Sequence, residues 1–247
     1  EVKARYGLKL NDGSIEWIRG GTFYLSEWYA KQNGLTADFT ARDLLEFMSD
    51  IYVDNHDLTP RTLYDLAERV LLAADLPLNG DSTVKWIIDD SLKNITTTAP
   101  LPRDTLANCL QVIANAGKCV LYQDRGGTLH IEPLKFDVTD YKINSFNSYS
   151  KSEITISKSI KQVTVKVYLY TTGEKGIEST TTDTTVNVGT TGETIVIDNP
   201  LITDSSMASA LGEWVGTHLG HRMTLDSSWR ADVRLDALDI VSNENEF

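Results

Sequence analysis

Alternating apolar and polar residues make residues 161–169 the most regular predicted strand of the chain. Apolar side chains fall on every second position, which is the period of a strand with one buried face. They are Val163, Val165, Val167 and Leu169, with Gln162, Thr164, Lys166 and Tyr168 between them. The pattern therefore predicts a strand that covers a core with its valine face.

A different period follows Thr59 and Pro60, where apolar residues recur three and four positions apart. They are Leu63, Leu66, Ala67, Val70, Leu71 and Ala74. This spacing predicts a helix with one apolar stripe, capped by Thr59, with Pro60 at its first position. Pro77 and Gly80 are expected to end it.

Three other segments carry helix signals. Residues 42–48 begin a helical pattern, and residues 104–116 show a second apolar stripe with Gly117 as its C-terminal stop. Residues 205–222 form a late helix that Ser205 or Ser206 can cap.

The remaining segments are expected to be β-structure. Strands are predicted at 5–10, 14–18, 22–29 and 35–40, with Gly20 and Gly21 breaking the second from the third. A hairpin with a glycine turn is predicted over 119–131, and a strand, turn and strand over 232–241.

These elements give an α+β class with helices between β regions. We expect residues 1–41 to begin an N-terminal β domain, 42–117 to form a helical insert, and 118–135 to return as a hairpin. Residues 136–247 form a second β domain with the helix 205–222. The absence of an initial Met and of a cap at Phe247 leads us to expect a segment of a longer protein.

Composition narrows the function classes. The chain has 247 residues, with 35 Asp and Glu against 23 Lys and Arg, for a formal net charge of −12. This balance argues against a sequence-specific nucleic-acid reader, which needs a basic surface. No apolar run reaches the roughly 20 residues of a membrane span. Cys109 and Cys119 are expected to be buried thiols, because an intervening helix would hold them too far apart for a disulfide.

The sequence contains only weak candidates for catalytic or metal-binding residues. Phosphate-loop, nucleophile-elbow and zinc-protease motifs are missing from the sequence. His218 and His221 share a helix face but have no third ligand at motif spacing. The acidic turn at 50–57 fails the calcium-loop pattern, because His56, Leu58 and Thr59 occupy its ligand and glycine positions. We therefore expect no catalytic residue, no metal and no cofactor.

Aromatic residues crowd the predicted strand 22–29. Strict alternation places Tyr24 and Trp28 on one face, with Phe23, Leu25 and Tyr29 on the other. Aromatics on both faces favour a strand covered by the core on one side and by a neighbouring domain or subunit on the other. Tyr24 and Trp28 are the candidate subunit or ligand contacts.

Several stretches together resemble the bacteriophage or prophage tail hub family, of the late-control or tail-tip type. They are residues 20–28 with 37–45, residues 103–133, residues 148–155 with 161–165, and the closing turn 234–241. In the closing turn, Leu238 stands where the family motif has Gly. The resemblance implies two related β-barrel-like domains joined by a helical insert, and a ring-like homotrimer.

The family resemblance also implies a role. Such a protein is a baseplate or tail-tip hub in the virion, assembled in the bacterial cytoplasm, that joins the tail tube to the tip or puncturing apparatus around the DNA channel. Its partners are copies of itself and other tail proteins. Two alternatives stay open: a carbohydrate- or receptor-binding module using Tyr24, Trp28 and the Thr-rich residues 179–194, and a hydrolase using the abundant carboxylates.

Overall fold

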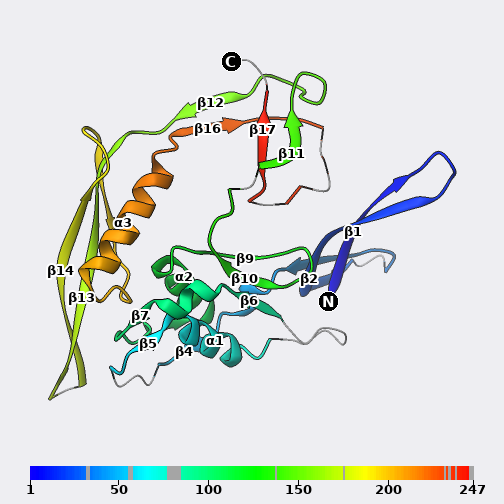
Figure 1. Cartoon of the computed structure of the whole chain (residues 1–247). Helices are drawn as coiled ribbons and strands as arrows, with labels where there is room; N and C mark the ends of the chain where they lie inside the picture. The colour runs from blue at the N-terminus through cyan, green and yellow to red at the C-terminus, as the bar shows by residue number, and fades with distance from the viewer. Residues whose placement is uncertain are drawn as a thin grey trace. The chain divides into compact units, whose positions relative to one another are not determined.

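A computed structural model of the chain describes residues 1–31, 34–54, 58–76, 85–136, 138–174, 176–230, 232, 235–236 and 238–244. The chain folds as two compact units, Glu1–Pro133 and Leu134–Phe247. Both contain helices and strands, so the class is α+β as predicted (Figure 1). The predicted domain ranges stay predictions, and barrel closure is not confirmed, because the described strands pair in sheets of two or three.

Unit 1 begins with a three-stranded antiparallel sheet. Its strands are β1 (Val2–Lys9), β2 (Ile15–Ala30) and β3 (Ala37–Arg42). The predicted break at Gly20 and Gly21 is wrong, because β2 runs through both glycines. The glycines instead form a bulge, in which Ala4 pairs with Gly21 and Arg5 with Arg19. A bulge keeps the strand continuous while admitting one extra residue.

Two helices supply a large part of the buried core of unit 1. They are α1 (Leu63–Ala73) and α2 (Leu106–Ala116), accompanied by the 3-10 turns η1 (Leu45–Phe47) and η2 (Asp90–Asn94). The helical pattern predicted from residue 42 is reduced to η1, since β3 extends to Arg42. The apolar stripes are buried as predicted, including Leu63, Leu66, Val70, Leu110 and Ile113.

The cap of α1 differs from the prediction. Thr62, rather than Thr59, accepts a hydrogen bond from the Asp65 amide at 3.0 Å. The reason is that β5 (Arg61–Thr62) pairs with β7 (Thr96–Thr97), which keeps the backbone extended up to Thr62. The second helix is entered in the same way, through β8 (Asp104–Thr105) paired with β4 (Ile51–Tyr52), and Thr105 caps it.

A third small sheet completes unit 1. Its order is β6 (Trp86–Ile88), β10 (Leu129–Glu132) and β9 (Val120–Gln123). Strands β9 and β10 are antiparallel, which confirms the predicted hairpin, whereas β6 joins β10 in parallel.

Unit 2 is built on β13 (Ile160–Gly173), which lies between β14 (Gly176–Asn187) and β15 (Glu193–Ile197). The predicted valine face is confirmed at Val163 and Val165, which are fully buried, but its predicted end is wrong, because Leu169 is 62% exposed. Helix α3 (Ser205–Leu219) packs on this sheet, and a Cβ on its Gly212 would lie 2.8 Å from Val186. Its cap is Asp204, which accepts from the Met207 amide at 2.8 Å, rather than either predicted serine.

Two strand pairs complete unit 2. They are β11 (Val138–Ile143) with β17 (Ile240–Asn243), and β12 (Glu153–Ile156) with β16 (Met223–Asp226). The predicted strand before residue 239 is wrong where it is described, and residues 231, 233, 234 and 237 lie outside the described part. Leu238 adopts a φ of 76°, so the left-handed turn that glycine would favour is kept with leucine in it.

Candidate functional site

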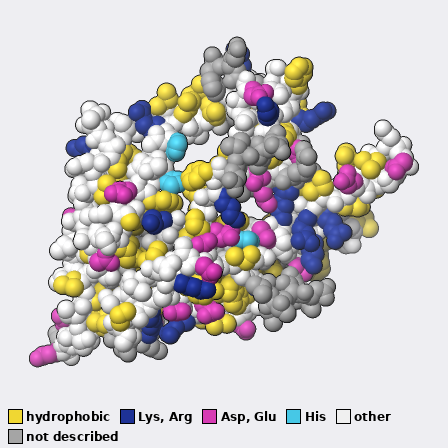
Figure 2. Space-filling view, in the orientation of Figure 1, with side chains coloured by type: hydrophobic (Ala, Val, Ile, Leu, Met, Phe, Trp, Pro, Cys, Tyr) yellow, Lys and Arg dark blue, Asp and Glu magenta, His cyan; other side chains and the backbone are white. Residues whose placement is uncertain are grey.

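The sheet β1–β2–β3 exposes large apolar side chains, and we call it the apolar sheet. Its exposed members are Tyr6, Leu8, Leu10, Ile15, Trp17, Leu25, Trp28, Tyr29, Leu35 and Phe39, counting the turns that join its strands. Single exposed apolar residues are ordinary on a protein surface, but a whole sheet of them marks an interaction surface. Hydrophobic side chains are visible along this region in Figure 2.

The faces of the apolar sheet follow from its strand register. Leu25 pairs with Ala41 and Glu27 with Thr40, so Ser26 is an extra residue in β2. This second bulge shifts the alternation of side chains by one position. The prediction that Tyr24 and Trp28 share a face is therefore wrong: Trp28 lies on the face of Leu25, and Tyr24 lies on the opposite one.

Tyr24 lies against its own chain. Its ring meets the Phe47 ring edge-on with centroids 6.1 Å apart, and its hydroxyl oxygen lies 3.4 Å from the Nζ of buried Lys85. Burial raises the pKa of Tyr24 and lowers the pKa of Lys85. Tyr24 therefore holds the apolar sheet to the rest of unit 1.

Trp28 is 66% exposed and pairs across the strands with Phe39, which is 61% exposed. The other face carries Trp17, which stands over Gly7: a Cβ there would lie 2.8 Å from the Trp17 ring. Exposed aromatics thus occupy both faces, and such residues are enriched among the strongest contacts of protein interfaces. Of the two candidate contacts, only Trp28 is well exposed.

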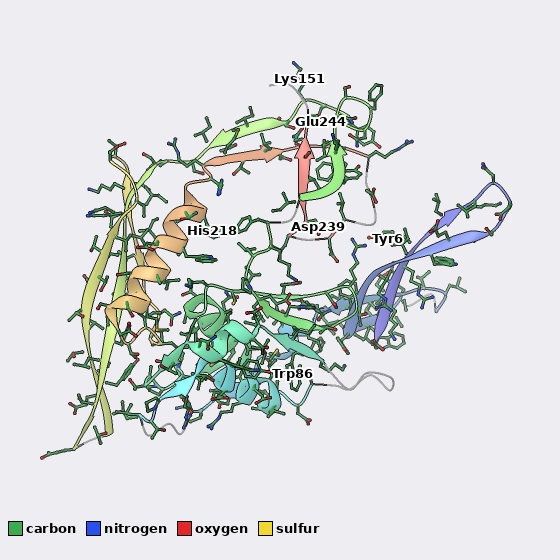
Figure 3. All side chains as sticks on the ribbon, in the orientation of Figure 1. Tyr6, Trp86, Lys151, His218, Asp239 and Glu244 are labelled. Atoms are coloured by element: carbon green, nitrogen blue, oxygen red, sulfur yellow. The ribbon has the colours of Figure 1, made fainter. Side chains whose placement is uncertain are left out.

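The first hairpin of the apolar sheet, residues 2–20, projects as an arm in Figure 1. Tyr6, labelled in Figure 3, lies on it and covers Gly20, where a Cβ would be 2.8 Å from the ring. Near the base of the arm, Arg5 pairs directly with Arg19. Figure 2 shows Lys and Arg side chains gathered at this place.

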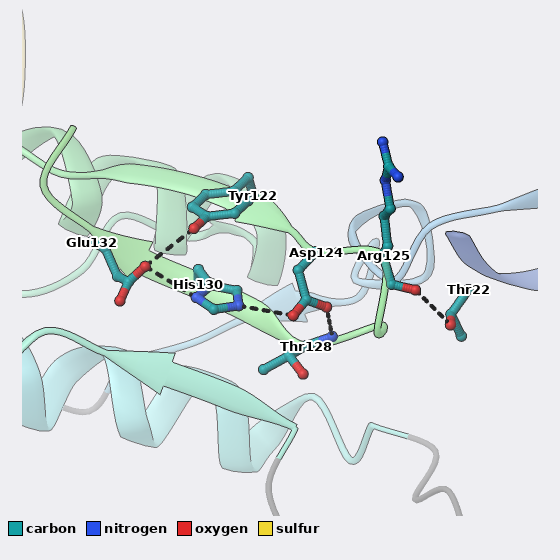
Figure 4. Close-up of polar contacts among 7 residues, drawn as sticks. All are labelled: Thr22, Tyr122, Asp124, Arg125, Thr128, His130 and Glu132. Atoms are coloured by element: carbon teal, nitrogen blue, oxygen red, sulfur yellow. Dashed lines mark hydrogen bonds and ion pairs between the residues drawn. The ribbon is translucent and has the colours of Figure 1, made fainter. Parts of the chain in front are cut away.

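The turn between β9 and β10 is attached to the apolar sheet by side-chain hydrogen bonds. Thr22 donates to the Arg125 carbonyl at 3.0 Å (Figure 4), and the Gln123 amide donates to the Thr22 carbonyl at 2.7 Å. The other end of Gln123 accepts from the Leu44 amide at 2.7 Å. Arg125 in turn donates to the Arg19 carbonyl at 3.3 Å. Sequence reasoning missed these residues, because none belongs to a known motif.

The most developed polar cluster surrounds His130 (Figure 4). Its Nδ1 lies 3.1 Å from Glu132 and its Nε2 lies 3.3 Å from Asp124, while Tyr122 stacks on the ring and donates to Glu132 at 3.1 Å. Asp124 also accepts from the Thr128 amide at 2.8 Å. Both ring nitrogens face carboxylates, so neither points at a space where a substrate could be deprotonated. These contacts stabilise the β9–β10 hairpin.

The prediction that His218 and His221 share a helix face is wrong, because α3 ends at Leu219 and His221 lies beyond it. His218 Nδ1 lies 2.7 Å from the Trp214 carbonyl, and its ring packs against Trp214 and Phe136. Its buried Nε2 has no hydrogen-bond partner within the part of the chain that the structure describes. Across those residues no group of three potential metal ligands comes together. Residues 55–57 of the acidic turn lie outside the described part.

Asp54, within that acidic turn, has a structural role. It pairs with Arg61 at 3.1 Å and accepts from the Leu101 amide at 3.0 Å, with both charged side chains largely buried. Both cysteines are free and buried, and burial raises the pKa of Cys109 to about 11 and of Cys119 to about 12. At neutral pH these thiols are protonated and unreactive.

An open groove in unit 2 is lined by residues 144–146, residues 148–151 and Glu244. Lys151 and Glu244 are labelled in Figure 3. Its charged side chains are Lys151 and Glu244, and Glu244 is paired with Lys142 at 2.7 Å. This lining offers no pair of carboxylates for acid and base roles. Among the described helices, none has the length and apolarity to cross a bilayer.

Comparison with known proteins gives matches in structure only. No family model matches the chain, and no curated protein does. The structure of the prophage MuSo2 43 kDa tail protein from Shewanella oneidensis matches with a TM-score of 0.58 and 16% identity, over 99% of this chain and 79% of that one. A tail protein from Neisseria meningitidis MC58 matches with a TM-score of 0.51 and 14% identity, over 87% of this chain and 64% of that one. The chain shares the fold of these two tail proteins, the first of which is from a prophage.

Proposed function

We propose that the chain is a structural subunit of a phage or prophage tail and not an enzyme. The observation that carries this proposal is a fold shared over nearly the whole chain with a prophage tail protein. The apolar sheet supports it, because a subunit of a large assembly needs surfaces that other subunits cover. Its place is the virion tail, after assembly in the bacterial cytoplasm.

Within the tail, we assign the chain to a hub at the baseplate or tail tip. There it joins the tail tube to the tip or puncturing apparatus as a homotrimer around the DNA channel. The net charge of −12 fits a channel wall, since carboxylates repel the phosphates of passing DNA. Trp28 and Phe39 supply apolar contacts to a neighbouring subunit.

The test is the mass of the purified chain in solution, by light scattering coupled to size exclusion and by sedimentation. We expect a species of three times 27.5 kDa that forms as concentration rises. A chain that stays monomeric at high concentration, and captures no other tail protein of its phage, would overturn the proposal.

One observation favours a second function, a carbohydrate- or receptor-binding module. Trp28 is exposed beside Phe39, and exposed aromatic rings can stack on sugars. Glycan-array and cell-wall binding of the wild-type chain and of Trp28→Ala separates the two functions. Binding that Trp28→Ala abolishes would favour the receptor module, whereas silence on both assays removes it.

A further inference from the structure

Two arginines face each other at the base of the arm. Arg5 and Arg19 are direct cross-strand partners, and both are exposed. Directly opposed side chains on an antiparallel pair have Cβ atoms about 4.5–5.5 Å apart, and like charges at this distance destabilise the sheet. The pairing of Arg5 with Arg19 therefore lowers the stability of the isolated chain.

A third arginine is held beside them. Arg125, on the β9–β10 turn, donates to the Arg19 carbonyl at 3.3 Å, and Thr22 fixes the Arg125 backbone. The turn also approaches the Arg19 guanidinium, since a Cβ on Gly126 would lie 3.4 Å from its Nη1 and 3.0 Å from Oδ1 of Asp124. The Asp124 carboxylate is already hydrogen-bonded to His130 and to the Thr128 amide. We call Arg5, Arg19 and Arg125 the arginine cluster.

No ion pair within the described residues neutralises Arg5 or Arg19. This is unexpected in a chain with 35 acidic and 23 basic residues, where most bases could find a carboxylate nearby. Trp17 lies on the same face of the arm two positions from Arg19, and it is 58% exposed. Arg and Trp are the residue types that are enriched at the centre of protein–protein interfaces.

We propose that the arginine cluster binds carboxylates of a second copy of this chain. The proposal rests on the homo-oligomeric function above and names the contact that it uses. Two copies with a net charge of −12 repel each other, so their interface needs concentrated positive charge against negative charge. Arg is suited to this contact, because its planar guanidinium donates two parallel hydrogen bonds to a carboxylate.

The experiment is sedimentation of the full chain across a range of NaCl concentrations, with two double variants. R5E/R19E places carboxylates where we expect the neighbour's carboxylates, and should weaken self-association about a hundredfold. R5Q/R19Q removes the like-charge repulsion and keeps the side chains polar. It should weaken association about tenfold while leaving the thermal unfolding of the monomer unchanged or slightly improved. K151E/K161E is the matched control, because it makes the same charge change at exposed lysines of unit 2, outside the apolar sheet.

The outcomes separate this proposal from the proposed function. Oligomers of the wild type that weaken with salt and with both arginine variants, but not with the control, support it. Oligomers that R5E/R19E and R5Q/R19Q leave intact overturn it and leave the structural function standing. A wild type that never self-associates overturns this contact and the homotrimer; the tail-subunit function falls as well only if the chain also captures no other tail protein. Duplex-DNA binding that R5E/R19E abolishes without any change in association would assign the cluster to phosphates and contradict the proposal.

Discussion

Large apolar side chains are buried in the helical part of unit 1 but exposed on its apolar sheet. Helices α1 and α2 bury their apolar stripes, and Leu66, Val70, Leu110 and Ile113 have no exposed surface. The apolar sheet leaves Trp17 and Trp28 more than half exposed, although burying such a side chain contributes about 1.5–3 kcal/mol or more. The helical part therefore buries its apolar stripes within the single chain, whereas the apolar sheet is suited to be covered by a partner.

The largest effect on folding should come from the helical part. Leu110→Ala removes a fully buried side chain of α2 and leaves a cavity, so the free energy of unfolding should fall by about 2–5 kcal/mol. Leu72→Ala is the control, because Leu72 on α1 is 63% exposed and should cost less than about 0.5 kcal/mol. Urea denaturation measures both. Equal losses of stability in the two variants would contradict the claim that Leu110 is buried and Leu72 exposed.

Trp17→Ala should separate folding from association. The ring is 58% exposed, so the free energy of unfolding of the monomer should change by less than about 0.5 kcal/mol. Self-association should weaken tenfold or more, which corresponds to about 1.4 kcal/mol or more. Denaturation and sedimentation of the same sample provide the two readings. A variant that unfolds more easily but associates normally would mean that Trp17 serves the fold of the arm alone.

Thr62→Ala tests the cap that the strand pair β5–β7 selects. Removing the hydroxyl leaves the Asp65 amide without its partner, so the free energy of unfolding should fall by about 1 kcal/mol. Thr59→Ala, the cap expected from sequence, should have a smaller effect. If Thr59→Ala proved the more damaging of the two, the observed start of α1 would be wrong.

The smallest effect on stability is expected at Leu238, an exposed leucine outside the apolar sheet. Leu238 has a φ of 76°, so Leu238→Gly should relieve backbone strain and raise the free energy of unfolding by about 0.5–1 kcal/mol. Association should be unchanged, unlike in Trp17→Ala. Thermal unfolding checks the first point and sedimentation the second; a loss of stability would show that the leucine side chain is needed.

Periodic segments of the fold could be predicted from the sequence, and residues whose geometry depends on pairing could not. The stripes of α1 and α2 and the valine face of β13 are periodic over enough residues to identify their faces. The two bulges could not be predicted, because the extra residues Gly20 and Ser26 are recognised only from the register with the partner strand. The error at Ser26 reversed the face of Trp28 relative to Tyr24.

The candidate site was only partly predictable for the same reason. Aromatic crowding in β2 pointed to a contact surface, and Trp28 is well exposed. The arginine cluster was missed, because Arg5, Arg19 and Arg125 come together only through the strand register and the β9–β10 turn. The structure, by contrast, places no metal-ligand group around His218 in the part that it describes.

Hydrogen–deuterium exchange at increasing protein concentration tests most directly whether the apolar sheet is covered by another copy. We expect amides of β1 and β2 to become slower to exchange as concentration rises, while those of α1 and α2, already buried in the single chain, keep their rates. Exchange in β1 and β2 that is rapid and independent of concentration, in a sample shown by sedimentation to be oligomeric, would contradict the account.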